Sequence, residues 1–227
     1  MAISLIRQSG AVSGTILTIT GAANGNVLIL FFASFGTSMN AISTISCTNV
    51  TWSSLGGALN GTSLDYEIWK GVVSGGTSGT TVTITQTGSG SFFNVSNIAE
   101  FSGVSTVNDT TGVTKTGTST SPSLNTYSTS TAGDLLLCGV GYHNGTVPSV
   151  LPGGSWNNLT FVNNGAQTGN QGEYNLNGAS GSQTATWTIS NVAWVTVVAA
   201  LKPIATFDWG STIYQPSIHY RHDIVTV

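Results

Sequence analysis

Charged residues are scarce in this sequence. Lysine, arginine, aspartate and glutamate together make up 6% of its 227 residues, against roughly 25% in an average soluble domain. Helices normally carry charged outer faces and strong helix formers such as Glu, Lys and Arg, so the composition argues against a helical fold. With five Lys and Arg and a net charge of −3, the chain offers no basic surface for nucleic acid or for an anionic membrane.

Long apolar runs and paired cysteines are lacking as well. The longest apolar run, VLILFFASF at 27–35, is too short to span a bilayer. The first residues, MAISLIRQSGAVSG, do not form the apolar segment of a secretory signal. The two cysteines, Cys47 and Cys138, have no metal-ligand spacing. We expect two unpaired thiols in or near the core, and a disulfide only if the two positions meet in space.

The residues that replace charge are Ser, Thr, Gly and Asn. Thr, Val, Ile and aromatic residues suit a pleated, half-buried sheet surface, and the 29 glycines supply turns. The composition therefore predicts an all-β fold. A surface of hydroxyls and amides is common in proteins that work on virions, on cell surfaces or outside cells. Together with the lack of a secretory signal, it favours a viral structural protein.

The clearest pattern is an internal duplication. Five segments recur in the same order about 100–108 residues apart, and a shared order is stronger support than any single match. The paired segments are 25–34 with 133–142, 50–57 with 154–161, 64–75 with 172–181, 78–86 with 181–190, and 97–104 with 196–204.

The duplication predicts one domain built from two halves. One half alone would leave an apolar sheet face bare, whereas two halves can cover each other. We therefore expect a jelly-roll-like two-sheet β-sandwich over residues 1–204, with half-repeats at about 14–104 and 133–204. The Ser/Thr-rich joint at 105–132 alternates in places and is expected to form edge strands. Pro203 is expected to end the last core strand.

Residues 205–227 have no counterpart in the repeat. This C-terminal segment is rich in aromatic residues, and SIHYRHDIVTV alternates like a strand. We expect either an arm that adds to the sheet edge of a neighbouring subunit or a strand folded back on its own domain. The candidate docking residues are Trp209, Tyr214, Ile218, Tyr220 and Ile224.

The order of motifs resembles a domain of phage virion and bacterial surface proteins. That domain has strings similar to AEYSGV and AGDLLV, and the matching strings here are AEFSGV, AGDLLLCGVGY and AWVTVVAALKP. The likeness covers about residues 14–204. The resemblance implies a jelly-roll-like sandwich on fibres, on capsid decorations or on secreted adhesins, and it brings no catalytic residues with it.

Few residues suggest chemistry. Asp65 and Glu67 in LDYEIW form a same-face carboxyl pair of the kind that glycoside hydrolysis needs. The reading we favour is solvent-facing polar residues on an edge strand. The duplicate segment GEYN keeps only one of the two acids, Glu173, aligned near Asp65. We therefore predict no catalytic residue.

No metal ligand or cofactor is expected either. His219 and His222, with Asp223 beside them, lie three residues apart in a strand-like segment, so the two imidazoles point to opposite faces. No nucleophile elbow and no phosphate-binding loop is present in its proper context.

The aromatic residues fall into two groups. Trp52 and Trp156 are duplicated, which predicts a shared packing role, and Trp187 and Trp194 lie in apolar segments typical of a core. Trp69 and Trp209 are the better candidates for stacking on a glycan.

Glu100, in FFNVSNIAEFSGV, is an acid inside an apolar strand. Its aligned partner is Ala200, so the fold does not require an acid there. We expect Glu100 to leave the core and to hold the Ser/Thr-rich joint by hydrogen bonds, because an unpaired carboxylate in the core is too costly.

These patterns predict a non-enzymatic virion structural protein at the particle exterior. It would be a capsid decoration or a fibre component, homo-oligomeric, with copies of itself and other virion proteins as partners. The alternative is a secreted or surface adhesin that binds host glycans. A third hypothesis is a polysaccharide-degrading enzyme that uses Asp65 and Glu67.

Overall fold

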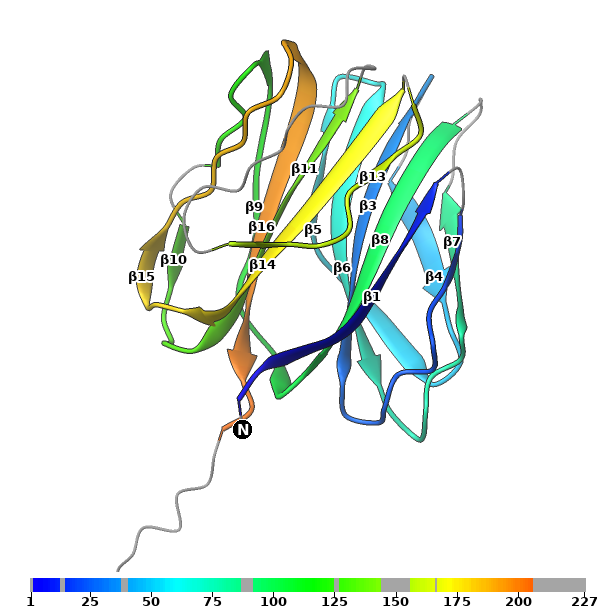
Figure 1. The fold of residues 1–227 in the computed structure, drawn as a ribbon, viewed down its shortest axis with the longest axis vertical. Coiled ribbons are helices and arrows are strands. Elements are labelled where there is room, and N and C mark those ends of the chain that lie inside the picture. The colour runs from blue at the N-terminus through cyan, green and yellow to red at the C-terminus, as the bar shows by residue number, and fades with distance from the viewer. Residues whose placement is uncertain are drawn as a thin grey trace, which may run out of the picture.

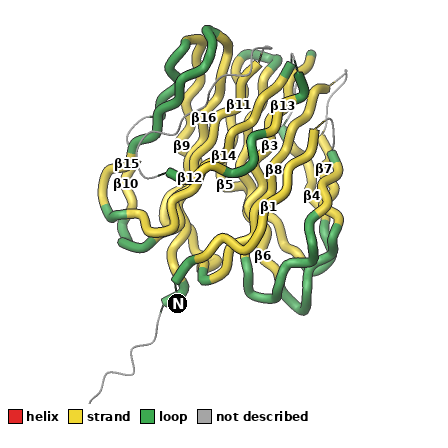
Figure 2. The backbone as a smooth tube through the Cα atoms, viewed as in Figure 1, coloured by secondary structure: helices red, strands yellow, loops and turns green. Residues whose placement is uncertain are grey.

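The computed structural model describes residues 2–12, 15–37, 41–86, 92–124, 127–143, 156–165 and 167–205. All regular secondary structure in these residues is β-strand, and the strands pair antiparallel in four sheets (Figures 1 and 2). The all-β fold class is thus confirmed. Among the described residues no helix is long and apolar enough to cross a membrane.

Two large sheets form the middle of the molecule. The first large sheet runs in the order β1 (Ser4–Val12), β8 (Phe92–Ser102), β3 (Val27–Gly36), β6 (Leu64–Val73) and β5 (Val50–Asn60). The second large sheet runs in the order β12 (Asn157–Asn158), β14 (Thr168–Gly178), β11 (Asp134–His143), β16 (Val192–Pro203) and β9 (Val104–Ser119), with β13 (Val162–Asn163) also paired to β14.

Two small sheets cover the outer faces of the large ones (Figure 1). A three-stranded sheet lies outside the first large sheet and consists of β2 (Ile16–Thr18), β7 (Thr81–Gln86) and β4 (Ile42–Ser46). A two-stranded sheet lies outside the second large sheet and consists of β10 (Tyr127–Thr129) and β15 (Gly181–Gln183). The sandwich of two facing sheets is therefore extended to four layers.

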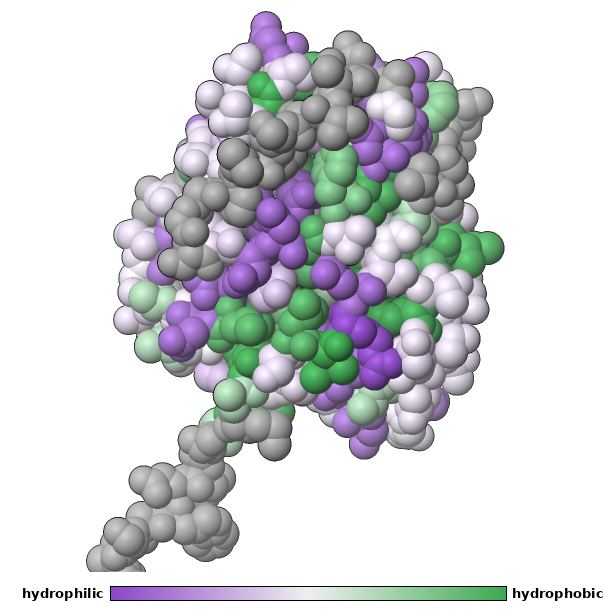
Figure 3. All heavy atoms as spheres, viewed as in Figure 1, coloured by the Kyte–Doolittle hydropathy of each residue, from purple (hydrophilic) through white to green (hydrophobic). Residues whose placement is uncertain are grey.

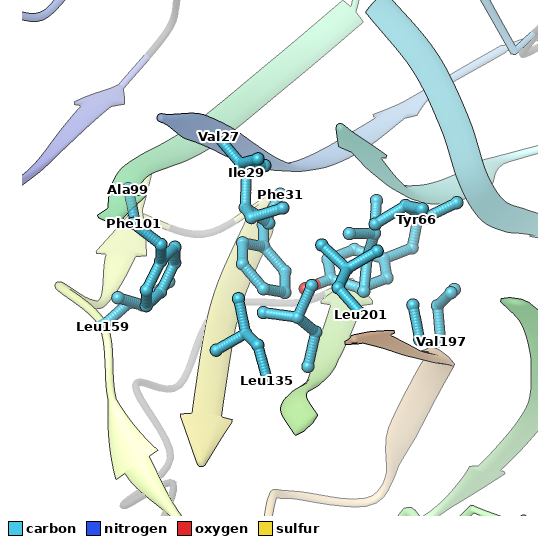
Figure 4. Close-up of a cluster of buried hydrophobic side chains, with 14 of the residues drawn as sticks. Val27, Ile29, Phe31, Tyr66, Ala99, Phe101, Leu135, Leu159, Val197 and Leu201 are labelled. Atoms are coloured by element: carbon cyan, nitrogen blue, oxygen red, sulfur yellow. The ribbon is translucent and has the colours of Figure 1, made fainter. Parts of the chain in front are cut away.

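Three hydrophobic clusters fill the spaces between these layers. The central cluster lies between the large sheets, and Figure 4 shows its side chains converging. The first outer cluster lies under the three-stranded sheet and includes Leu17, Ile19, Leu28, Leu30, Phe32, Val82 and Ile84. The second outer cluster lies under the two-stranded sheet and includes Leu124, Tyr127, Cys138, Val140, Tyr142, Trp187 and Trp194.

The unbroken apolar run of β3 follows from this layering. Successive side chains of a strand point to opposite faces, and on β3 both faces are covered. Val27, Ile29, Phe31 and Ala33 belong to the central cluster, whereas Leu28, Leu30 and Phe32 belong to the first outer cluster.

The central cluster depends on glycines in the second large sheet. Tyr66 of β6 is fully buried and packs over Gly139 and Gly141 of β11, where a Cβ would collide with its ring. The Tyr66 hydroxyl donates to Asn170 Oδ1 at 3.0 Å, and Asn170 Nδ2 donates to the carbonyl of Phe31 at 3.0 Å. A chain of two hydrogen bonds therefore joins the two large sheets inside an apolar core.

The two large sheets share a strand order. Read from β1, the first follows the path β1, β8, β3, β6, β5; read from β9, the second follows β9, β16, β11, β14, β12. The small sheets pair β2 with β7 and β10 with β15. This order is what an internal duplication would produce. The duplication and the jelly-roll topology themselves stay predictions.

Several local expectations can be compared directly. Most of the Ser/Thr-rich joint lies in β9, an edge strand, and in the short β10, and Pro203 is the last residue of β16. Both cysteines are free: Cys47 packs against the first outer cluster and Cys138 is buried in the second. The C-terminal docking residues Trp209, Tyr214, Ile218, Tyr220 and Ile224 lie outside the described residues.

Candidate functional site

Asp65 and Glu67 lie side by side on one face of β6. Their neighbours Leu64, Tyr66 and Ile68 point into the central cluster, so the two carboxyls point to the opposite face. They are 1% and 4% exposed, and β6 lies between β3 and β5. The expectation of solvent-facing residues on an edge strand is therefore wrong, because β5 covers the edge and the outer layer covers the face.

Glu67 is held by two N–H donors. The backbone N–H of Ile42 donates to Glu67 Oε1 at 2.6 Å, and Trp69 Nε1 donates to Glu67 Oε2 at 2.7 Å. Hydrogen bonds to a carboxylate favour its charged form. The start of β4 and an indole ring therefore fix this carboxylate in place.

Asp65 is the protonated member of the pair. Burial, the charge of Glu67 and a hydrogen bond to Glu67 raise the pKa of Asp65 to about 9, although a backbone hydrogen bond acts to lower it. No N–H or O–H group of the other described residues donates to Asp65 Oδ2. Two adjacent carboxyls that share a proton are a recognised arrangement at functional sites.

A pocket of about 410 Å³ reaches both carboxyls. The strand register places Leu59 opposite Asp65 and Gly57 opposite Glu67, so these residues lie on the same face. A Cβ at Gly57 would lie 2.7 Å from Glu67 Cγ, which means that glycine keeps the space open. The described residues that line it are Ala41, Ser54, Gly57, Ala58, Leu59, Asp65 and Glu67.

Trp69 borders the carboxyl pair but does not line the pocket. Its side chain is partly buried, packs against the first outer cluster and uses its Nε1 on Glu67. Trp209, the other predicted glycan-stacking residue, lies outside the described residues. Stacking of a glycan on either ring stays a prediction.

The other tryptophans pack as expected. Trp187 and Trp194 are buried. Trp52 and Trp156 are partly buried against the first and the second outer cluster, respectively.

Glu173 does not correspond to Asp65. When β11 is aligned with β3 as the sequence repeat has it, Cys138 takes the place of Leu30. Cys138 pairs with Glu173 and Leu30 pairs with Trp69, so Glu173 takes the place of Trp69. The predicted alignment is wrong because it ignored the strand register.

Glu173 sits in its own buried environment. Trp187 Nε1 donates to Glu173 Oε1 at 2.7 Å, and Cys138 Sγ lies 3.7 Å from Oε2. Burial raises the pKa of Glu173 to about 7, although the hydrogen bonds from Trp187 and Cys138 lower it. This carboxyl joins β14 to the segment under the two-stranded sheet.

Glu100 is fully buried and does not reach the Ser/Thr-rich joint. Its Oε1 accepts the backbone N–H of Ala23 at 3.1 Å and Asn26 Nδ2 at 2.5 Å, and its Oε2 lies 2.6 Å from Arg7 Nε. Glu100 is therefore a structural anchor, but not of the Ser/Thr-rich joint as expected. It ties β1 and the turn before β3 to the first large sheet. An ion pair on the outer face makes burial tolerable.

Asp109 performs the role that was expected of Glu100. It accepts the backbone N–H of Ser130 at 2.5 Å and the Ser130 hydroxyl, and Lys202 Nζ lies 3.4 Å away. Burial acts to raise its pKa, but the bonds from Ser130 and its other neighbours lower it to about 2. A signal was present in the sequence, because Asp109 is the one acidic residue between 105 and 132.

Asp134 shares this site at the start of β11. It is fully buried, and burial together with a hydrogen bond to Asp109 and the charge of Asp109 raises its pKa to about 7, while Lys202 acts to lower it. Its counterpart in the first half is Asn26, which binds Glu100. Both halves thus carry a polar residue at this turn, close to a carboxyl group of a neighbouring strand.

The described residues contain no group of three or more His, Cys, Asp or Glu side chains that could hold a metal ion. His219, His222 and Asp223 lie outside them. Comparisons of the chain with protein-family models, with curated proteins and with solved structures find no match. The resemblance to the phage and surface-protein domain therefore stays a prediction that rests on the sequence motifs.

Proposed function

We propose that this protein is a non-enzymatic structural protein of the exterior of a phage-like virus particle, as a capsid decoration or a fibre component. The position of its charges carries the proposal. Of the ten charged residues in the described part of the chain, six are buried and four are partly buried, so none is fully exposed. The buried ones are Asp65, Glu67, Lys70, Glu100, Asp134 and Glu173.

These charges bind other parts of the same chain. Lys70 Nζ donates to the carbonyl of Thr106 and to Asn108 Oδ1, both at 2.6 Å, and so joins β6 to β9. Arg7 and Lys202 bind Glu100 and Asp109. Charged side chains used in this way stabilise strand positions and supply no free reactive group.

Most of the exposed side chains in the described residues are therefore uncharged: hydroxyls and amides, with some apolar side chains such as Ile6, Ile16 and Val107. Figure 3 shows small hydrophobic and hydrophilic patches interspersed with residues of intermediate hydropathy. A surface on which no charged residue of the described part is fully exposed has only weak long-range attraction for nucleic acid or membranes, and its interactions depend little on ionic strength. Both properties suit a protein that faces a variable exterior medium.

The carboxyl pair gives limited support to an enzyme. Both oxygens of Glu67 accept hydrogen bonds from the protein itself, which leaves a poor general base. The single buried pair therefore fits binding or structure better than acid–base catalysis.

Localisation tests the proposal. Particles from the source culture would be purified on a density gradient and analysed by peptide mass spectrometry and by immunogold microscopy. We expect the protein to co-sediment with particles and antibodies to label intact particles, with pre-immune serum as the control. A protein found in the medium or on a cell envelope, and absent from particles, would contradict the proposal.

An adhesin is the second candidate, because a pocket lies beside Trp69, one of the predicted glycan-stacking residues. Full-length protein and a Trp69→Ala variant would be compared on a glycan array. Binding that Trp69→Ala abolishes supports the adhesin, whereas a blank array for the wild-type protein counts against it.

A further inference from the structure

The pocket beside Asp65 and Glu67 offers hydrogen-bond acceptors. Asp65 is 1% exposed and lines the pocket, and none of the other described residues donates a hydrogen bond to its Oδ2. Buried oxygens nearly always accept hydrogen bonds. A ligand that brings an N–H or O–H group into this pocket would therefore give this oxygen the donor that the described residues do not supply.

The pocket also carries negative charge that no described cation neutralises. Two carboxyls that share one proton have one negative charge between them. The described cationic side chains bind elsewhere: Arg7 to Glu100, Lys70 to Thr106 and Asn108, Lys115 to Ser123, and Lys202 to Asp109. An incoming positive charge would thus meet an acceptor-rich, anionic floor.

The walls of the pocket are apolar. Leu59 is 43% exposed at the rim and Ala41 lines the pocket as well, whereas the Ala58 side chain packs against the central cluster on the other face of β5. Such walls suit the methylene stem of a long cationic side chain. A calcium ion needs 6–8 oxygen ligands, whereas the described side chains that line this pocket supply two carboxyls and the Ser54 hydroxyl.

We propose that this pocket binds a cationic nitrogen group on a short apolar stem, namely a lysine or arginine side chain of a neighbouring protein. The inference rests on the proposed function for the source of that side chain, a partner in the assembled particle. The ammonium or guanidinium group donates to Asp65 and Glu67, and the stem packs against Leu59.

Binding of the cation releases the proton that the pair shares. A positive charge beside Asp65 favours its ionised form, so affinity rises with pH until Asp65 is ionised in the free protein. Glu67 is the other titratable group that faces Asp65. Strands β3, β4, β5 and β7, which surround the pair, contain no titratable residue.

Calorimetry on the full-length protein tests the proposal. The probes are lysine and arginine blocked at both backbone ends, so that only the side chain is charged, with blocked glutamine, glucose and calcium chloride as comparisons. Titrations at pH 7.5 in two buffers of different protonation enthalpy report proton release. We expect the cationic probes to bind about tenfold more tightly than blocked glutamine and to release protons.

Variants locate the site. Asp65→Asn with Glu67→Gln removes the charge and should abolish preferential binding, whereas Glu173→Gln removes a buried carboxyl outside the pocket and should leave it unchanged. If the double variant does not fold, Leu59→Arg at the exposed rim supplies a competing guanidinium and should weaken binding of the probe about tenfold.

Several outcomes would overturn the proposal: equal binding of blocked glutamine, tighter binding of glucose or calcium, or binding that Leu59→Arg leaves intact. The test is independent of localisation. If the protein binds cations but is absent from particles, the proposed function and the proposed source of the side chain are wrong. The proposal that the pocket binds a cationic group would still hold.

Discussion

Arg7 and Glu100 form an ion pair between β1 and β8, with Arg7 Nε 2.6 Å from Glu100 Oε2. The two residues are partners in the strand register, and Glu100 is fully buried whereas about a third of the Arg7 side chain is exposed. Because Glu100 also binds the turn at Ala23 and Asn26, one carboxylate fixes the edge strand and the entry to β3 together.

Glu100→Gln should destabilise the protein. The amide keeps the shape of the side chain but presents an N–H₂ group to donors and loses the ion pair, and breaking a buried pair costs about 3–5 kcal/mol. Since Arg7 stays partly solvated, we expect a loss of about 2–3 kcal/mol, measured by urea unfolding followed by circular dichroism.

Lys115→Gln is the matched control for Glu100→Gln. Lys115 is partly buried and its Nζ donates to Ser123 Oγ at 3.2 Å, so the loss of this side-chain amine should change the free energy of unfolding by less than about 0.5 kcal/mol. If the two substitutions lowered the free energy of unfolding equally, the proposed role of Glu100 in fixing β1 and the turn before β3 would be contradicted.

Asp134→Asn should change how stability depends on pH. Unfolded aspartate loses its proton near pH 3.9, whereas folded Asp134 keeps it up to about 7. Between these values the folded state binds more protons, so Asp134 lowers the free energy of unfolding as pH rises. The asparagine variant, which copies Asn26 of the first half, should match the wild type near pH 4 and exceed its stability at pH 8 by a few kcal/mol, at about 1.4 kcal/mol per pKa unit.

Asp109→Asn should change the pH dependence of stability in the opposite direction to Asp134→Asn. The pKa of Asp109 is lowered to about 2, so its ionised form contributes stability that is present above pH 4 and is lost as pH falls towards 2. This variant should therefore be less stable than the wild type at pH 7. Thermal unfolding from pH 3 to 9 checks both variants, and parallel curves for all three proteins would refute the assignment.

Much of the fold could be predicted from the sequence, because buried strands have a recognisable pattern of apolar residues. Scarce charge and the runs VLILFF and DLLLCGV predicted strands. These runs are unbroken because the facing large sheet covers one face of β3 and β11 and an outer layer covers the other. The outer layers themselves were not predicted. Their strands are as short as three residues, which is too short for a clear alternation.

The carboxyl sites were harder to predict, since they depend on distant pairs. Asp65 and Glu67 were recognised as a same-face pair, which follows from a spacing of two. Whether that face is exposed depends on residues of other strands, Ile42 at the start of β4 and Gly57 in β5. The local sequence of β6 does not show that these residues pack against it. Glu100 was placed on the correct face of its strand, but its partner Arg7 is 93 residues away and no local pattern points to it.

Gly139→Ala and Tyr66→Phe should be energetically coupled. A Cβ at Gly139 would collide with the Tyr66 hydroxyl and crowd its ring carbon Cζ at 2.9 Å, and such overpacking costs about 1–3 kcal/mol. Tyr66→Phe leaves Asn170 Oδ1 without its donor, at a cost of about 1–2 kcal/mol. Because phenylalanine lacks the colliding hydroxyl, the double variant should lose at least about 0.5 kcal/mol less than the sum of the single losses.

Gly178→Ala gives the control for that cycle. Its Cβ would meet Leu136. Leu136 points to the opposite face of β11 from Leu135 and Leu137, which share the central cluster with Tyr66, so the effect of Gly178→Ala should add to that of Tyr66→Phe. Urea unfolding of the six proteins measures both cycles. Additive effects in the Gly139 cycle would mean that the backbone shifts to accommodate the methyl group independently of Tyr66.

Deletion of residues 207–227 should leave a folded domain that no longer assembles. The three hydrophobic clusters draw on described residues no later than Leu201, so the deletion removes none of these core side chains. Light scattering after size exclusion reports the oligomeric state, and circular dichroism reports the strands. Ile218→Asp, which places a charge on the apolar face of the predicted arm at full length, should reproduce the loss of assembly. A truncated chain that assembles as the wild type does would refute the docking arm, and one that fails to fold would favour the alternative in which this segment packs on its own domain.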